Sequence, residues 1–232
     1  MLKGQIKPIS EYNRQEVEKM FSLMTEFYDN IDKQVFLKDF LNKDYCLTLY
    51  HETDGLVGFT TQKLLNFDAN GKTVHGIFSG DTIIHKDYWG STELFRVWSE
   101  FWFEFAEQYD EFYWFLICKG YKTYRIMPLF WNEFYPNYKT QTPPYEQSII
   151  DAYAELLYPD EYNRVTGVIE YKSVKDKLKD GVADIDEHQL RNKDISYFCT
   201  KNPNHTNGND LACLAKIDKS LLKKRMLGLL FK

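Results

Sequence analysis

The 232-residue sequence lacks the features that mark several large classes of protein. No run approaches the roughly 18 consecutive apolar residues that a membrane-spanning helix needs, so we expect neither an integral membrane protein nor a membrane partner. The 4 cysteines are too few and too unevenly spaced for a disulfide framework, and we expect free, mostly buried thiols. They are Cys46, Cys118, Cys199 and Cys213.

An excess of positive charge is also absent, because 29 lysines and arginines stand against 34 aspartates and glutamates and give a formal net charge of −5. Nucleic-acid-binding domains usually carry a strong basic excess, so we expect no nucleic-acid partner. Basic residues gather only between Lys216 and Lys232, where they fit the solvated face of a terminal helix. The residues after Met1 lack the apolar segment of a secretory signal peptide, and we therefore expect a cytoplasmic protein.

Apolar and aromatic side chains are abundant, at 44% and 17% of residues. A chain of this length buries about 70–75% of the surface that it exposes when unfolded. Together these facts exclude disorder as the main state. They predict a single domain over residues 1–232 in preference to two small ones.

The apolar pattern changes from helical to extended within the first 84 residues. Apolar residues such as Val17, Met20 and Met24 recur at helical spacing. Further on, the stretches Thr53–Gly55 and Phe67–Lys72 have the chemistry of hairpin turns. We predict helices at 13–28 and 34–41, then a β-meander of strands at Tyr45–His51, Leu56–Asn66 and Val74–Ile84.

After the meander the helical period returns from Ser91 to about Tyr109. The next segment, Phe112–Cys118, is apolar without alternation, which is typical of a central strand covered on both faces. A helical stretch at Tyr121–Phe134, interrupted at Pro128, follows it. The first 138 residues are therefore predicted to run α-α-β-β-β-α-β-α.

The second part of the chain begins with a segment at 139–194 that we interpret as an insertion. An amphipathic helix is predicted from Pro143-Pro144 through Leu157, and the sequence becomes polar and charged from Ser173 to Asp194. Beyond the insertion we predict two final strands, Ile195–Lys201 and Leu211–Ile217, and a C-terminal helix within 218–232.

This order of elements resembles the GNAT (Gcn5-related N-acetyltransferase) superfamily of acyl-CoA-dependent transferases. The stretch Phe78–Gly90, FSGDTIIHKDYWG, looks like that family's central strand and the start of its pyrophosphate loop. The resemblance covers roughly residues 10–138 and, through the late strand pair, 195–217. It implies an α/β (α+β) fold with a mixed, mostly antiparallel central sheet flanked by helices and an insertion before the last two strands. It also implies transfer of an acyl group from acyl-CoA to an amine acceptor, a small-molecule substrate.

The family's pyrophosphate loop has the pattern Arg/Gln-x-x-Gly-x-Gly/Ala, whose backbone N–H groups and following helix N-terminus hold the coenzyme A pyrophosphate. In one register of this sequence Trp89 replaces the Arg or Gln, and Thr92 and Leu94 replace the glycines. A shifted register makes Gly90 the middle glycine and puts Asp87 and Thr92 at the other two positions. With coenzyme A or acyl-CoA as cosubstrate, the resemblance implies contacts at Ile83, Ile84, His85, Trp89, Gly90, Ser91 and Thr92.

The strand at Val74–Ile84 carries the candidate bases. Alternation puts every second residue, from His75 through Asp81 to Ile83, on one face, and Gly80 marks an expected bulge. In the GNAT family the corresponding strand supplies a backbone N–H to the thioester carbonyl and often carries a carboxylate that deprotonates the substrate ammonium. The resemblance thus implies Asp81 or His75 as the base. Two plainer interpretations stay open, in which His75 is a surface residue at the strand start and Asp81 a hydrogen-bonding residue at the strand end.

The family also places a tyrosine near the end of the next helical region, where it protonates the departing thiolate. Tyr135 is the residue that the resemblance implies for this role, with Tyr124 in reserve. Because the chain has 17 tyrosines, a core aromatic is the alternative interpretation of both.

The strongest candidates for metal ligands are Cys199, His205 and Cys213. Their spacing matches none of the paired C-x-x-C arrangements of structural zinc sites, and two of them lie in predicted strands. We therefore expect no metal.

Three functional hypotheses follow. The leading one is an acyltransferase that uses acyl-CoA, and its rival is a non-catalytic GNAT-like module that binds a small molecule and has lost the loop glycines. A third is an interaction protein whose aromatic surface binds a partner or a second copy, so a homodimer stays open. Native mass spectrometry separates the three: co-purifying coenzyme A supports the enzyme, another small molecule the module, and a ligand-free dimer the interaction protein.

Overall fold

The computed structural model describes residues 1–172 and 176–231. Its centre is an eight-stranded sheet with the order β1-β3-β4-β5-β6-β10-β8-β7. Neighbouring strands are antiparallel except for β5 and β6, which run parallel. The strands are β1 (Leu2–Pro8), β3 (Tyr45–His51), β4 (Gly55–Ala69), β5 (Lys72–Ile84), β6 (Phe112–Cys118), β7 (Tyr162–Asn163), β8 (Val168–Ile169) and β10 (Asp210–Lys216).

The predicted meander is present as β3, β4 and β5, joined by tight turns. Gly55 and the pair Asn70-Gly71 have positive φ angles, which glycine and asparagine adopt at the least cost in such turns. The sequence analysis missed β1, which pairs antiparallel with β3 at one edge of the sheet. Its lysines and glutamine alternate with half-buried residues, so β1 has too few apolar side chains to be recognised as a strand.

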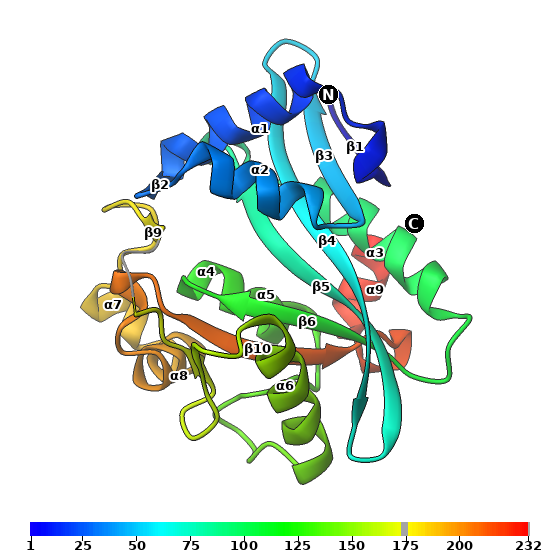
Figure 1. The fold of residues 1–232 in the computed structure, drawn as a ribbon, viewed down its shortest axis with the longest axis vertical. Coiled ribbons are helices and arrows are strands. Elements are labelled where there is room, and N and C mark those ends of the chain that lie inside the picture. The colour runs from blue at the N-terminus through cyan, green and yellow to red at the C-terminus, as the bar shows by residue number, and fades with distance from the viewer. Residues whose placement is uncertain (173–175, 232) are drawn as a thin grey trace.

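Helices cover both faces of the sheet. The face that we call the α6 face is covered by α1 (Arg14–Phe27) and α2 (Lys33–Leu41) over the first strands and by α6 (Pro144–Leu157) over the later ones (Figure 1). The opposite face, the α3 face, packs against α3 (Glu93–Ala106) and α9 (Lys224–Leu230). Asparagine and proline begin two of these helices: Asn13 forms a capping box with Glu16, and Pro144 occupies the first turn of α6.

Strands β5 and β6 stay paired over only part of their length. His75–Ser79 pairs with Phe112–Leu116, and beyond this point the two strands diverge (Figure 1). The short helices α4 (Tyr121–Tyr124) and α5 (Ile126–Phe130) follow β6 directly, on the α3 face. This divergence splits the sheet into two halves, and the hollow beside it that is lined from both β5 and β6, called the cleft below, is described with the site.

One predicted strand is wrong. Residues Ile195–Lys201 lie in a helix, α8 (Lys193–Lys201), whose first amide groups donate to the side chain of Asn192. Ile195 and Phe198 are buried three residues apart, a spacing that puts both on one helix face. The strand beside β10 is instead β8, from the segment interpreted as an insertion.

The 139–194 segment also supplies α6, β7 and the helix α7 (Glu187–Leu190). Its strand β9 (Lys177–Leu178) pairs with β2 (Tyr28–Asp29) in a separate two-stranded sheet. Ser173–Lys175, in the polar stretch, and Lys232, at the end of the predicted C-terminal helix, lie outside the described residues. Nowhere in the described ranges is there a helix both long and apolar enough to cross a membrane.

Candidate functional site

A bulge interrupts β5 beside the point where β5 and β6 separate. Thr82 pairs with Thr60 of β4, whereas Ser79 pairs with Gln62, so β5 uses one residue more than β4 over this stretch. The predicted bulge at Gly80 is therefore confirmed. The predicted common face is wrong, because the extra residue reverses the alternation: Ile77 packs on the α3 face and Ile83 on the α6 face.

Beyond the bulge, β5 has a free edge. The pairing with β6 ends at Ser79, and no other strand of the described chain pairs with Gly80–Ile84 on that side. Backbone N–H and C=O groups on an unpaired strand edge are ready to bond an extended ligand that carries amides of its own. Asp81 lies on this edge, and Ser79 and Thr82 beside it line the cavity described next.

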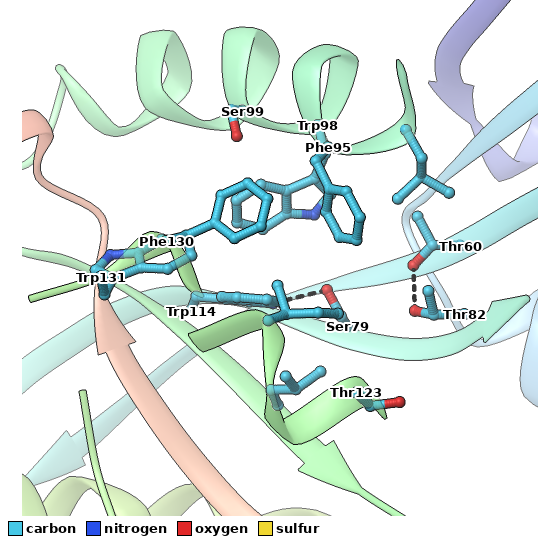
Figure 2. Close-up of a pocket in the computed structure, with 13 residues that line it drawn as sticks. Thr60, Ser79, Thr82, Phe95, Trp98, Ser99, Trp114, Thr123, Phe130 and Trp131 are labelled. Carbon is cyan, nitrogen blue, oxygen red and sulfur yellow. Dashed lines mark hydrogen bonds between the residues drawn. The ribbon is translucent and has the colours of Figure 1, made fainter. Parts of the chain in front are cut away.

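A narrow cavity lies against this edge on the α3 face. Figure 2 shows Phe95 and Trp98 of α3 above the strands, with Phe130 and Trp131 closing one end. The free space in the cavity is about 20 Å³, little more than one water molecule needs. Its walls are mostly apolar, and four of its polar side chains are paired: the hydroxyls of Thr60 and Thr82 lie 2.8 Å apart, and Trp114 Nε1 donates to Ser79 Oγ at 2.8 Å (Figure 2).

Asp81 follows the bulge and is half-buried. Alternation from Ile83 puts its side chain on the α6 face, the same side as Lys43, whose stem passes close to Gly80. Burial and then the Asp39 carboxylate raise the pKa of Asp81 to about 6, against the opposing effect of the Lys43 ammonium. A carboxyl group with this pKa is ionised at neutral pH and is basic enough to accept a proton.

A second charged group lies where β6 ends. Lys119 Nζ lies 3.1 Å from an Asp176 carboxylate oxygen and 3.4 Å from one of Asp210, and the hydroxyl of Tyr171 donates to Asp210 at 3.0 Å. Burial raises the pKa of Asp210, although Lys119 and Tyr171 oppose that shift. The pKa of Tyr28 is raised by burial and then by Asp81, Asp176 and Asp210, so the carboxylates of both charged groups act on one hydroxyl.

Sequence reasoning missed these charged residues. Lys119 directly follows the apolar run of β6, and Asp210 directly precedes that of β10. The available signal was a charged residue at the end of a buried strand. Because β6 and β10 are antiparallel, the end of β6 lies beside the start of β10, which brings Lys119 close to Asp210. The partnering of Lys43 with Asp39 on α2 had no such signal.

The predicted coenzyme A loop lies between β5 and α3. Trp89 Nε1 donates to the Ile84 carbonyl at 2.7 Å, and the Lys122 ammonium lies 3.5 Å from the centroid of the Trp89 ring. Within the described residues the backbone N–H groups of Gly90, Thr92 and Leu94 have no hydrogen-bond partner. These groups belong to the approach and first turn of α3, where free N–H groups and the helix dipole favour an anion.

Glu93 brings a negative charge to the same helix turn, but that charge is compensated. Its carboxylate lies 2.8 Å from Arg96 Nη2 and accepts a 3.4 Å hydrogen bond from the Gly4 amide. The Arg96 hydrogen bond holds the pKa of Glu93 below its ordinary value. The carboxylate is therefore directed to Arg96 and is not a free charge at the mouth of the loop.

Two predicted residues do not join Asp81. His75 lies near the start of β5, with its ring centroid 4.6 Å from that of Tyr109, and the six residue steps from it to Asp81 span about 20 Å of strand. Tyr135 bridges to Leu214 of β10 and packs on the α6 face, where its hydroxyl donates to Glu133 at 3.0 Å. The reserve tyrosine, Tyr124, is fully buried and donates to the Pro136 carbonyl at 2.9 Å.

The cysteine and histidine candidates are also dispersed. Cys199 lies on α8, His205 begins a short turn after it, and Cys213 is buried in β10. In residues 1–172 and 176–231 no group of three or more His, Cys, Asp or Glu side chains is placed to hold a metal ion.

Comparison with known proteins gives structural resemblances alone, since no family profile and no curated protein matches this sequence. A conserved protein of unknown function from Enterococcus faecalis, described as a probable N-acyltransferase, aligns with a TM-score of 0.41 and 15% identity over 53% of this chain. The match spans only 31% of that protein.

Two further structures align over comparable lengths. NAA60 of Arabidopsis thaliana, solved with a bisubstrate analogue, has a TM-score of 0.40 and 10% identity over 60% of this chain and 93% of its own. The GNAT family N-acetyltransferase YhbS of Escherichia coli, solved with CoA, has a TM-score of 0.37 and 10% identity over 51% and 64%. The sheet of this chain is mixed, mostly antiparallel and flanked by helices, as predicted, and the chain resembles GNAT-fold proteins at low sequence identity.

Proposed function

We propose that this protein transfers an acyl group from acyl-CoA to an amine acceptor in the cleft between β5 and β6. The observation that carries the proposal is the free edge of β5 at Gly80–Ile84 with the ionisable Asp81 beside it. An extended thioester arm with amide groups fits such an edge. An amine needs a nearby base before it can attack, and Asp81 supplies one.

The loop residues fit the phosphate end of coenzyme A in spite of their departure from the family pattern. Free N–H groups at Gly90, Thr92 and Leu94 can donate to phosphate oxygens, and the Lys122 ammonium lies over Trp89 at the same loop. A side chain at Gly90 would meet nothing within 4 Å, so the approach to these groups is open. Arg96 compensates the one carboxylate in the first turn.

The reaction that we propose needs no covalent enzyme intermediate. Asp81 takes a proton from the acceptor ammonium, and the amine nitrogen forms a bond to the thioester carbonyl carbon. A backbone N–H of the β5 edge stabilises the charge that develops on the carbonyl oxygen. The carbon–sulfur bond then breaks, the nitrogen of the new amide loses its second proton to water, and the thiolate takes up a proton from water, since neither Tyr135 nor Tyr124 reaches this edge.

We also propose that the chain forms one domain, with the 139–194 segment as part of it. Strands β7 and β8 extend the central sheet beyond β10, and Tyr153 of α6 donates to main-chain carbonyls of both β6 and β10. A segment that completes the sheet in this way is not a separate folding unit.

Coenzyme A is expected to raise the melting temperature of the protein, and adenosine alone is not, because the pyrophosphate is the group held at the loop. A ligand at about 100 times its Kd stabilises the folded state by about 2.7 kcal/mol, which corresponds to several degrees for a chain of this size. Differential scanning fluorimetry at millimolar ligand measures the shift.

The matched variant is Thr92→Gly, which restores a small residue to the loop and should enlarge the shift. No shift with coenzyme A in either protein would contradict the proposed loop. A shift without turnover on any amine would instead favour the non-catalytic binding module.

A further inference from the structure

A second cavity lies where the start of β6, the end of β10 and the start of α6 meet. Its volume is about 270 Å³, and it shares no lining residue with the cavity of Figure 2. This volume lies just below the range of about 300–1,000 Å³ that is usual for small-molecule sites. Tyr135, which the sequence analysis singled out as a catalytic acid, is part of its wall.

Tyrosines form much of the wall of this second cavity. Tyr113 and Tyr135 are more than nine-tenths buried, and Tyr145 stands at the start of α6. The face of a tyrosine ring attracts a cation, and the Lys72 ammonium already lies 5.0 Å from the centroid of the Tyr145 ring. The rings thus offer both apolar contact and favourable electrostatics to a positively charged ligand.

The charged groups of the wall are mostly carboxylates. The wall carries the carboxylates of Glu111, Glu133, Glu146 and Asp218 and one ammonium, that of Lys216, which is 2.8 Å from Glu111. The Lys72 ammonium acts on Glu111 from beside the wall. Within the described part of the chain, Glu146 has neither a hydrogen bond nor an ion pair through its side chain. Burial and then Glu133 raise the pKa of Tyr135, so this hydroxyl stays protonated beside the carboxylates. Four carboxylates therefore stand against the two ammonium groups of Lys216 and Lys72, which leaves the cavity a surplus of negative charge.

The carboxylates are spread around the wall instead of converging on one point. No group of three acidic, His or Cys side chains in the described ranges is placed to hold a metal ion. A ligand with several ammonium groups separated by methylenes meets both features, because its charges can reach separate carboxylates while its methylenes lie against the rings. We propose that this second cavity binds an aliphatic polyamine, and the inference stands apart from the acyl-transfer proposal.

Isothermal titration calorimetry with spermidine at low ionic strength tests this site. We expect saturable binding to the wild type and an affinity at least about tenfold lower in the Glu133→Gln/Glu146→Gln double variant, which removes two of the carboxylates. Tyr145→Leu, which removes one ring and no charge, should also weaken binding. The matched control is Glu104→Gln, an exposed residue of α3 outside the cavity, which should bind as the wild type does.

Several outcomes would overturn the proposal. One is the absence of binding at millimolar spermidine, and another is unchanged affinity in both the double variant and Tyr145→Leu. Loss of binding in Asp81→Asn would place the polyamine in the cleft between β5 and β6. A third is that Mg²⁺ and Na⁺ at the same ionic strength displace spermidine equally while Tyr145→Leu has no effect. Binding would then be a non-specific attraction between charges, which salt screens.

Discussion

Asp81→Asn is expected to lower kcat by about 10²–10⁴-fold, the range for loss of a general base, while the affinity for acyl-CoA changes little. The amide cannot take the proton from the acceptor ammonium. In the wild type, kcat/KM should rise with pH through about 6, where the Asp81 carboxyl ionises. Steady-state kinetics with an acyl-CoA and amine pair found by screening measure both effects.

The same variant is expected to be more stable than the wild type at neutral pH. The pKa of Asp81 is raised in the folded state, so its ionisation costs folding free energy. That cost is absent below pH 4, where the carboxyl is protonated in both states, and is fully present above pH 6. Replacement by a neutral amide removes it. Lost turnover with a raised melting temperature at pH 8 would separate a catalytic role from damage to the fold.

The outcome that contradicts the assignment is equally clear. Full turnover in Asp81→Asn, with the pH profile unchanged, would show that the base is another group or solvent. The matched control is Asp218→Asn, which removes a carboxyl group outside the cleft and should leave kcat and its pH dependence unaltered if the effect belongs to Asp81.

Gly76→Ala is expected to be the most damaging small substitution in the sheet. A Cβ atom at this position would lie 2.4 Å from the Tyr113 carbonyl oxygen and 2.3 Å from Phe115 Cε2. The carbonyl is part of the pairing between β5 and β6 and cannot rotate away, so the strands must separate. We expect a loss of about 3 kcal/mol in the free energy of unfolding, measured as a lower urea midpoint.

Gly90→Ala is the matched control for this change. A Cβ atom at Gly90 would meet nothing within 4 Å, so the unfolding free energy should change by less than about 0.5 kcal/mol. If Gly76→Ala were as stable as Gly90→Ala, the close parallel pairing at the closed end of the cleft could not be right.

Much of the fold follows from the apolar pattern. Tyr45–His51 and Phe112–Cys118 were predicted with their observed bounds, because the first is mostly apolar up to a turn and the second is a continuous apolar run. The apolar pattern did not predict β1, whose residues are only partly buried, and it did not distinguish a short helix from a strand in α8. The residues of α8, with the apolar Ile195 and Phe198, were predicted as a strand because a helix of nine residues is too short to show a clear helical period.

The site was harder to predict because it depends on contacts between distant segments. Gly80 correctly predicted the bulge. The bulge, however, reverses the alternation of side chains along β5, and the prediction that His75 and Asp81 share a face had assumed an unbroken alternation. Tyr135 follows the helical region after β6, where the resemblance placed the acid, yet its bridge to Leu214 holds it on the α6 face, outside the cavity of Figure 2. Nothing in the local sequence specifies such a bridge, because it forms between residues almost eighty positions apart.

Hydrogen–deuterium exchange with and without coenzyme A tests the central claim most directly. If the thioester arm lies along the free edge of β5 and the phosphates lie at the start of α3, the ligand should slow exchange in peptides covering residues 80–84 and 90–95. Peptides from β3 and α6 should exchange as before. Protection confined to other segments, or unchanged exchange at residues 80–84 when coenzyme A is bound, would contradict the account.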